Sequence, residues 1–467
     1  MNILESIDNI LNETGLQNMK ELAKNYKEAE IYFHIDTDGV CSGIGIREYL
    51  KRYGIKTVDV HKIQYGDQEY AIPFPKKGRI AVLVDFAHGK PVMKIHTDHH
   101  DNQVGAEFTK KSGATSFVKT PSNAAYISQT LSPSDIFPPK DIKIISTIDS
   151  ADFASQNITP DDIMRAVYNL NPDLDIMKNH RAMGFAVNKL LLTYKNKEGF
   201  LENLVMHAKP SLVSMYNLIK KLAKEAGYKP PKDIEVGVKD YSKLQKDKIL
   251  PSKKPADVKN LKNGESMLIG NTIIQYGGGN MFGGYDRYVP FKNFPYADYL
   301  CIAWSMGLIQ ISKNPFKSGK NLYNLADIGW KVMDKFKSKL NKMVDLSYIK
   351  WNFDKNIKEW GAMGFRITDL FALFKGKIKT KENVGSEGWK KLSEILKKPS
   401  KFIKKEEKEI LKNVEISIWD IMKAQSGGHH DITNIQGFSF LGKGYTSTMK
   451  DVMVEISKEM KDKRLEE

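Results

Sequence analysis

Residues with metal-binding side chains follow a short apolar run near the start of the sequence. The segment 31–43 reads IYFHIDTDGVCSG and places His34, Asp36 and Asp38 two residues apart. Side chains two residues apart on a strand point to the same side, so an imidazole and two carboxylates would crowd together where a strand ends. Like charges at such short range are unfavourable unless a cation lies between them. The segment therefore indicates a cation site, with a solvated loop and a helix N-cap as the alternative.

Three later apolar runs also lead into residues that can bind metals. These runs and the residues at their ends are 79–85 with Asp85, 92–95 with Asp98, His99 and His100, and 141–148 with Asp149. We expect each run to be a strand, and the ends of parallel strands meet at one edge of a sheet. Carboxylate and imidazole ligands suit a pair of Mn²⁺ or Mg²⁺ ions, and two such ions can clamp a phosphate. Satisfied polar groups at strand ends are the alternative.

The pattern of the first 158 residues alternates between strands and helices. We expect further strands at 31–33, 58–63 and 114–120, helices at 43–53 and 121–131, and one or two amphipathic helices within 1–26. Strands that alternate with helices predict an α/β fold with a doubly wound parallel sheet. His88 and His96 lie near the candidate ligands. Each is either an additional ligand, a residue that orients a ligand, or an ordinary packed or surface histidine.

Four motifs, HIDTDG, VDFAHG, TDHHDN and TIDSADF, resemble in this order those of the DHH phosphoesterase superfamily. Its members include RecJ-type single-strand exonucleases, nano-RNases, cyclic-dinucleotide phosphodiesterases and family II pyrophosphatases. The metal ligands that the resemblance implies are His34, Asp36 and Asp85 for one ion, and Asp38, Asp85, His99 and Asp149 for the other. Asp85 would bridge the two ions and His100 would face the scissile phosphate. Asp98 would orient a ligand histidine through a hydrogen bond.

The same resemblance implies a second, DHH-associated domain that binds the substrate. Its glycine-rich loop would be formed by Gly427, Gly428, His429 and His430, whose backbone and imidazoles can contact a phosphate. Residues 297–312 read as two strands joined by a short turn, followed by Lys313 and Asn314 where the family frequently has arginine. Arg287, in the glycine-rich segment 276–287, is a further candidate phosphate contact.

These features divide the chain into three parts. We expect a DHH catalytic domain at 1–158, a helical connector at 159–240 and an α/β DHH-associated domain at 241–467. The last part would hold a Lys-rich helical insert at about 330–425, in which aromatic residues are interleaved with the lysines. Such a composition suits single-stranded nucleic acid, where bases stack and phosphates pair with cations. The alternative is a small helical core with a solvated lysine surface.

The charge of the chain points to a polyanionic partner. Its 72 lysines and arginines exceed its 56 aspartates and glutamates, which gives a formal net charge of +16. This excess favours nucleic acid before membrane, unless the surface is simply rich in solvated lysine. The two cysteines have no zinc-type spacing, and we expect a reducing, cytoplasmic location and no membrane segment. The sequence does not predict an oligomeric state.

The sequence as a whole predicts a hydrolase with two divalent cations, Mn²⁺ before Mg²⁺. We expect a RecJ-like exonuclease that acts on single-stranded DNA or RNA. The alternatives are a phosphodiesterase for nano-RNA, a cyclic dinucleotide or phosphoadenosine phosphate, and a non-catalytic scaffold of a replication complex.

Overall fold

The computed structural model describes about half of the chain, in separate segments. The described segments are 19–63, 76–86, 95–99, 115–117, 120–131, 136–168, 180–194, 198–227, 249–250, 254–276, 290–303, 308–317, 350–352, 362–366, 379–380, 404–407, 414–417 and 445–461. The chain forms two compact units, Met1–Tyr241 and Ser242–Glu467. The three-part division at 158 and 240 stays a prediction.

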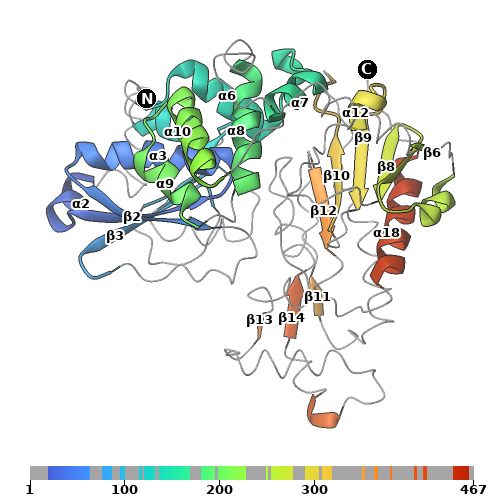
Figure 1. Cartoon of the computed structure of the whole chain (residues 1–467). Coiled ribbons are helices and arrows are strands. Elements are labelled where there is room, and N and C mark those ends of the chain that lie inside the picture. The colour runs from blue at the N-terminus through green and yellow to red at the C-terminus, as the bar shows by residue number, and fades with distance from the viewer. Residues whose placement is uncertain are drawn as a thin grey trace, which may run out of the picture. The chain divides into compact units, whose positions relative to one another are not determined.

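A parallel sheet of five strands organises the first unit (Figure 1). The strands are β1 (Glu28–His34), β2 (Lys56–Ile63), β3 (Arg79–Val84), β4 (Ile95–Asp98) and β5 (Thr115–Phe117). Their order is β2-β1-β3-β4-β5, and every neighbouring pair is parallel. The predicted α/β fold with a parallel sheet is thus confirmed. The chain passes from β1 to β2 on one side and from β3 to β4 on the other, so the strand order reverses between β1 and β3, and sheets of this kind usually bind ligands at the carboxyl ends of such strands.

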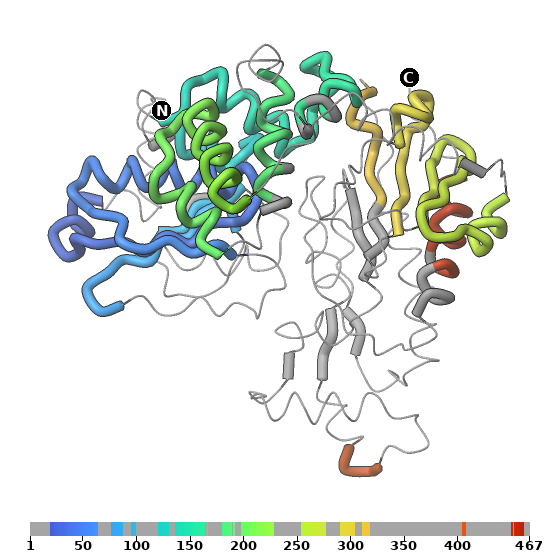
Figure 2. Tube along the Cα trace, in the orientation of Figure 1, coloured from blue at the N-terminus to red at the C-terminus, as the bar shows by residue number. Residues whose placement is uncertain are grey.

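The core of this unit lies between the sheet and the helix that follows β1. Helix α3 (Thr37–Arg52) packs against β1 and β3, and α9 (Phe200–His207) packs against α3 and β2 (Figures 1 and 2). A Cβ atom at Gly43 would lie 3.1 Å from Val205 and 3.4 Å from Phe33, so the absence of a side chain lets α3 approach both elements. The predicted helix at 43–53 is therefore present, and it begins at Thr37.

The fourth predicted ligand-bearing strand, at 141–148, is wrong, because these residues belong to helix α6 (Pro139–Ser150). Its buried apolar positions include Ile142, Ile145 and Ile148, three residues apart, which is a helical repeat. Pro139 at the start of the helix and Ala151 at its end, with φ of 51°, are typical of helix termini. A short apolar run of β-branched residues does not by itself separate strand from buried helix.

The helical structure expected of the connector at 159–240 is present where the structure describes this range. The helices in this region are α7 (Pro160–Tyr168), α8 (His180–Tyr194), α9 and α10 (Leu212–Glu225), and they belong to the first unit. Two side chains fasten them to the sheet domain. The Arg47 guanidinium donates to the carbonyl groups of Val205 and Ala208 at the end of α9. The Asp141 carboxylate accepts the Leu212 N–H at the start of α10, at 3.0 Å.

The described part of the second unit contains a mixed sheet of six strands. The strands in spatial order are β12 (Ala362–Arg366), β10 (Leu308–Lys313), β9 (Tyr299–Ala303), β8 (Thr272–Tyr276), β7 (Glu265–Ile269) and β6 (Ile249–Leu250). The predicted pair of strands within 297–312 is confirmed as β9 and β10, which are antiparallel.

Further described elements of this unit include a smaller sheet and a terminal helix. They are β11 (Lys350–Asn352), β13 (Lys379–Thr380), β14 (Val414–Ser417), α12 (Pro290–Asn293) and α18 (Tyr445–Met460).

In the first unit, helix α2 (Met19–Asn25) is the described part of the helical region predicted within 1–26. Among the described residues of both units, no helix has the length and apolar character needed to cross a membrane.

Candidate metal centre

The turn between β1 and α3 brings the first three candidate ligands together. Strand β1 ends at His34, and Asp36 is the N-cap residue of α3, where its Oδ1 accepts the Gly39 N–H at 2.8 Å. A Cβ atom at Gly39 would lie 2.3 Å from the His34 carbonyl oxygen, which is a severe clash. Glycine therefore allows the start of α3 to lie directly over the end of β1. In this arrangement the Asp36 Oδ2 lies 2.8 Å from the His34 Nδ1.

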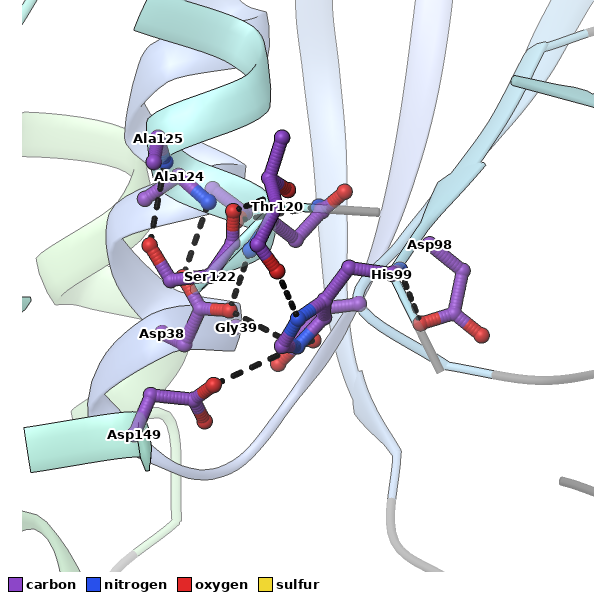
Figure 3. A network of polar contacts seen from close by, with 12 residues as sticks. Asp38, Gly39, Asp98, His99, Thr120, Ser122, Ala124, Ala125 and Asp149 are labelled. Carbon is purple, nitrogen blue, oxygen red and sulfur yellow. Dashed lines mark hydrogen bonds and ion pairs between the residues drawn. The ribbon is translucent and has the colours of Figure 1, made fainter. Parts of the chain in front are cut away.

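Asp38 is buried in the first turn of α3, and two backbone amides fix its carboxylate. Its Oδ2 accepts the Asn123 N–H at 2.6 Å, and its Oδ1 accepts the Ala124 N–H at 2.8 Å (Figure 3). The Ser122 hydroxyl caps the start of α5 (Asn123–Tyr126) by accepting the Ala125 N–H at 3.1 Å. These contacts place the start of the helix predicted at 121–131 next to the site.

Asp85 follows β3 with its backbone in the left-handed region, at φ of 55°. Aspartate is found in this conformation more often than most residues apart from glycine, although it carries a conformational cost. The Asp85 N–H donates to the Thr97 carbonyl oxygen at 2.9 Å, which holds the residue against the end of β4. The side chain is completely buried, and each of its two carboxylate oxygens faces a different histidine. Its Oδ2 lies 3.6 Å from the His34 Nδ1, and its Oδ1 lies 3.4 Å from the His99 Nε2.

His99 stands at the centre of the second ligand group. Its Nδ1 lies 3.1 Å from the Thr120 carbonyl oxygen, and because a carbonyl can only accept, this nitrogen carries the hydrogen (Figure 3). The Nε2 atom then faces the carboxylates of Asp38, Asp85 and Asp149, each at 3.4 Å. Asp149 reaches this position from the last turn of α6.

The donor atoms fit two divalent cations that share one carboxylate. The two groups are His34, Asp36 and Asp85, and Asp38, Asp85 and His99, and within each group the donor atoms lie within 4.8 Å of one another. An ion held octahedrally at about 2.1 Å keeps neighbouring ligand atoms about 3 Å apart. The 3.4 Å separations around the His99 Nε2 are close to that value and longer than a good N–H···O hydrogen bond. Imidazole with carboxylate is a donor set that Mn²⁺ accepts readily.

The electrostatics of the centre favour bound cations. Burial raises the pKa of Asp38 and of Asp149 well above the ordinary range, and the neighbouring Asp85 carboxylate raises both further. Burial alone would lower the pKa of His34 and of His99, but the adjacent carboxylates raise both well above the ordinary value. The buried centre thus contains more negative charge than its two imidazoles balance, and added positive charge would be stabilised.

Some of the remaining predicted site residues lie in the described part of the chain, and the others lie outside it. Asp98 is buried, and its Oδ1 accepts the His99 backbone N–H at 2.8 Å, while the Thr120 carbonyl binds the His99 ring. In the second unit, Lys313 ends β10, and the Asn314 side chain donates to the Ala297 carbonyl oxygen at 2.8 Å and accepts the Phe316 N–H at 3.0 Å. The predicted residues outside the described segments are His88, His100, Arg287, Gly427, Gly428, His429 and His430, as is most of the insert at 330–425. The described residues of that insert include the strands β11, β12, β13 and β14, so the expectation of a helical insert is wrong for these residues.

Several residues shape the centre in ways that the sequence did not predict. They are Gly39, Thr97, Thr120, Asn123 and Ala124. Four of them, Thr97, Thr120, Asn123 and Ala124, contact the candidate ligands through backbone groups, which carry no side-chain signature. The Asn123 side chain donates to the Ser42 hydroxyl at 3.0 Å and the Thr97 hydroxyl at 3.1 Å, joining α3, β4 and α5 (Asn123–Tyr126). Of these residues, only Gly39 gave a signal in the sequence, because a glycine directly after HIDTD can indicate that two backbone segments approach closely.

Comparison with known proteins gives matches among solved structures. No protein-family model and no curated protein matches the sequence. The chain is similar to the DHH domain of a member of a family of ribosomal proteins, at 10% identity and a TM-score of 0.39, over 74% of this chain and 85% of that one. It is similar to an exonuclease RecJ bound to manganese, at 11% identity and a TM-score of 0.36, over 78% and 92%.

A RecJ from Thermus thermophilus in complex with Mn²⁺ is similar at 10% identity and a TM-score of 0.35. This match covers 75% of the present chain, which spans only 52% of that protein. The chain resembles DHH-domain proteins.

Proposed function

We propose that this protein is a two-metal phosphodiesterase of the DHH type that hydrolyses single-stranded nucleic acid. The observation that carries the proposal is the position of Asp85, which presents one carboxylate oxygen to each of two ligand groups. A carboxylate shared in this way would hold two cations a few ångströms apart, the spacing that suits an in-line displacement at phosphorus.

The proposed ligands are His34, Asp36 and Asp85 for the first ion, and Asp38, Asp85, His99 and Asp149 for the second. Two divalent cations bound there would supply Lewis acidity, neutralising charge on the phosphate and activating the attacking water. The protein would hold the ligands ready for binding. Gly39 and Thr120 fix the orientation of Asp36 and His99, and the amides of Asn123 and Ala124 hold both oxygens of Asp38.

The net charge of +16 supports a polyanionic substrate. The interleaved lysines and aromatic residues of the insert at 330–425 support single strands, although that insert lies largely outside the described residues. The loop 426–430 and Arg287 remain proposed phosphate contacts on the ground of their sequence alone. The intact ligand set argues against a purely structural scaffold.

The proposal is tested by a product ladder. The protein is incubated with Mn²⁺ and end-labelled DNA and RNA single strands, from dinucleotides to long oligomers, with a cyclic dinucleotide in parallel. Stepwise release of mononucleotides that improves with strand length is the expected result. Cleavage limited to the shortest oligomers or to the cyclic dinucleotide would instead indicate a phosphodiesterase for small substrates. Metal binding without any hydrolysis would favour the non-catalytic scaffold of a replication complex.

A further inference from the structure

A buried histidine on β4 lies beside the turn that carries the shared carboxylate. His96 is 2% exposed and pairs in register with Leu83 of β3, two positions before Asp85. Its Nε2 lies 2.7 Å from the carbonyl oxygen of Phe86, the residue that follows Asp85. Because the carbonyl can only accept, the His96 Nε2 donates this hydrogen bond.

This bond fixes a turn that the local backbone does not favour. Asp85 has a φ of 55°, in the left-handed region, where a residue with a side chain carries a conformational cost. Two hydrogen bonds from β4 hold the turn on its two sides. The Thr97 carbonyl oxygen accepts the Asp85 N–H at 2.9 Å, and His96 binds the carbonyl of the next residue.

Phe86 connects the same bond to a second candidate ligand. Its ring is 3% exposed and packs against the His34 imidazole, with ring centroids 5.9 Å apart and an interplanar angle of 54°. The ring also belongs to a buried cluster with Tyr32, Ala81 and Leu83 on the sheet. A shift of the Phe86 backbone would therefore disturb both the Asp85 turn and the packing behind His34.

We infer that His96 is a positioning residue for the first metal site, acting on Asp85 and His34 through Phe86. Apart from the shared Asp85, two ligands of the second site have supports of their own. Asp38 is held by the amides of Asn123 and Ala124, and His99 by the Thr120 carbonyl. Removing the donor at position 96 should thus weaken the first site more than the second. This inference rests on the proposed two-metal centre.

The test is a Mn²⁺ titration of the full chain after removal of metal with a chelator. Binding is followed by calorimetry, and the distance-sensitive spin coupling between two Mn²⁺ ions by electron paramagnetic resonance. His96→Leu removes the donor, and His96→Gln places an amide N–H where the Nε2 was. His61→Leu changes a half-buried histidine of the same sheet that stacks on Tyr32, and it serves as the matched control.

The wild type, His96→Gln and the His61→Leu control should bind two coupled ions. His96→Leu should bind one ion with affinity within about threefold of wild type, and the other at least about tenfold more weakly, with loss of the coupled signal. Should His96→Leu not fold, His96→Asn replaces it, because its amide occupies the Nδ1 position and cannot reach the Phe86 carbonyl.

Two results would overturn the inference without touching the proposed function. The first is two coupled ions of wild-type affinity in His96→Leu or, where that variant does not fold, in His96→Asn. The second is equal weakening of both sites that His96→Gln fails to restore. A wild-type protein that binds fewer than two ions would instead reject the two-metal centre itself.

Discussion

Strand β1 takes part in two buried acidic clusters of opposite character. Glu30, in the middle of the strand, is 4% exposed, and its Oε1 accepts a hydrogen bond from the Arg79 guanidinium at 2.8 Å. At the end of the strand, four aspartates meet the two imidazoles of His34 and His99. The first cluster contains its own permanent cation, whereas the second contains groups whose charge depends on protonation.

The pKa shifts of the two clusters differ in the same way. Burial raises the pKa of Glu30, but the hydrogen bond from Arg79 and further hydrogen bonds outweigh it, so the net shift is downward. Burial and the neighbouring carboxylates both raise the pKa of Asp38 and of Asp149. A buried acid that is balanced by arginine is a structural feature. Buried acids that crowd together without such a balance indicate a site for an external cation.

The largest expected effect is that of Asp85→Asn. Asparagine tolerates the left-handed backbone, so the fold should persist, while the amide removes the charge and the bridging capacity. Loss of several kcal/mol of charge stabilisation predicts a fall in phosphodiester hydrolysis of at least about 10³-fold. The measurement is the initial rate on an oligonucleotide at saturating Mn²⁺. Glu30→Gln, the same kind of chemical change in the balanced cluster, is the control and should leave the rate within about twofold.

The second prediction concerns the approach of α3 to β1. Gly39→Ala would place a Cβ atom 2.3 Å from the His34 carbonyl oxygen, so the start of α3 must move and Asp36 with it. Mn²⁺ affinity should fall at least about tenfold. Gly45→Ala on the same helix meets only side-chain carbons of Ile127 and Ile136, both at 3.2 Å, and should change the affinity little. Equal affinities in the two variants would show that this close approach does not position the ligands.

A smaller effect is expected from the balanced cluster. Glu30→Gln removes the charge that the Arg79 hydrogen bond stabilises and should lower the free energy of unfolding by about 1–2 kcal/mol. Chemical denaturation of the metal-free protein measures it. A stability gain in this variant would mean that Arg79 does not compensate the burial of Glu30.

The smallest effect is the pH dependence of that stabilisation. Because the folded pKa of Glu30 lies below the unfolded value of about 4.3, its contribution is present above about pH 4.3 and is lost as the pH falls through the folded pKa. The stability difference between wild type and Glu30→Gln should therefore shrink on acidification below the unfolded pKa. If the stability difference instead grows in this pH range, the folded pKa of Glu30 lies above its unfolded value.

The sequence predicted the ligand-bearing strand ends better than the elements that connect them. The runs ending at His34 and Asp85 are apolar and rich in β-branched or aromatic residues, and they are the central strands β1 and β3. The run before Asp149 is also rich in β-branched residues but follows Pro138 and Pro139, and it is a helix. Both arrangements deliver an aspartate to one place, so the ligand set did not depend on the type of element.

The supports of the centre could not be predicted, because they depend on contacts between distant segments. Asp38 meets the amide of Asn123, 85 residues away in the sequence, and His99 meets a backbone carbonyl 21 residues away. The role of His96 likewise follows from its pairing beside β3 and not from any motif. Hydrogen bonds to backbone groups are specified by tertiary packing and leave no pattern in the residue types.

The most direct test of the central claim is anomalous diffraction at the manganese edge from crystals of the full chain grown with Mn²⁺. Two anomalous peaks should lie on either side of the Asp85 carboxylate, one beside His34 and Asp36, the other beside Asp38 and His99. A single peak that makes no contact with Asp85, or no peak at these residues, would contradict a two-metal centre built on a shared aspartate.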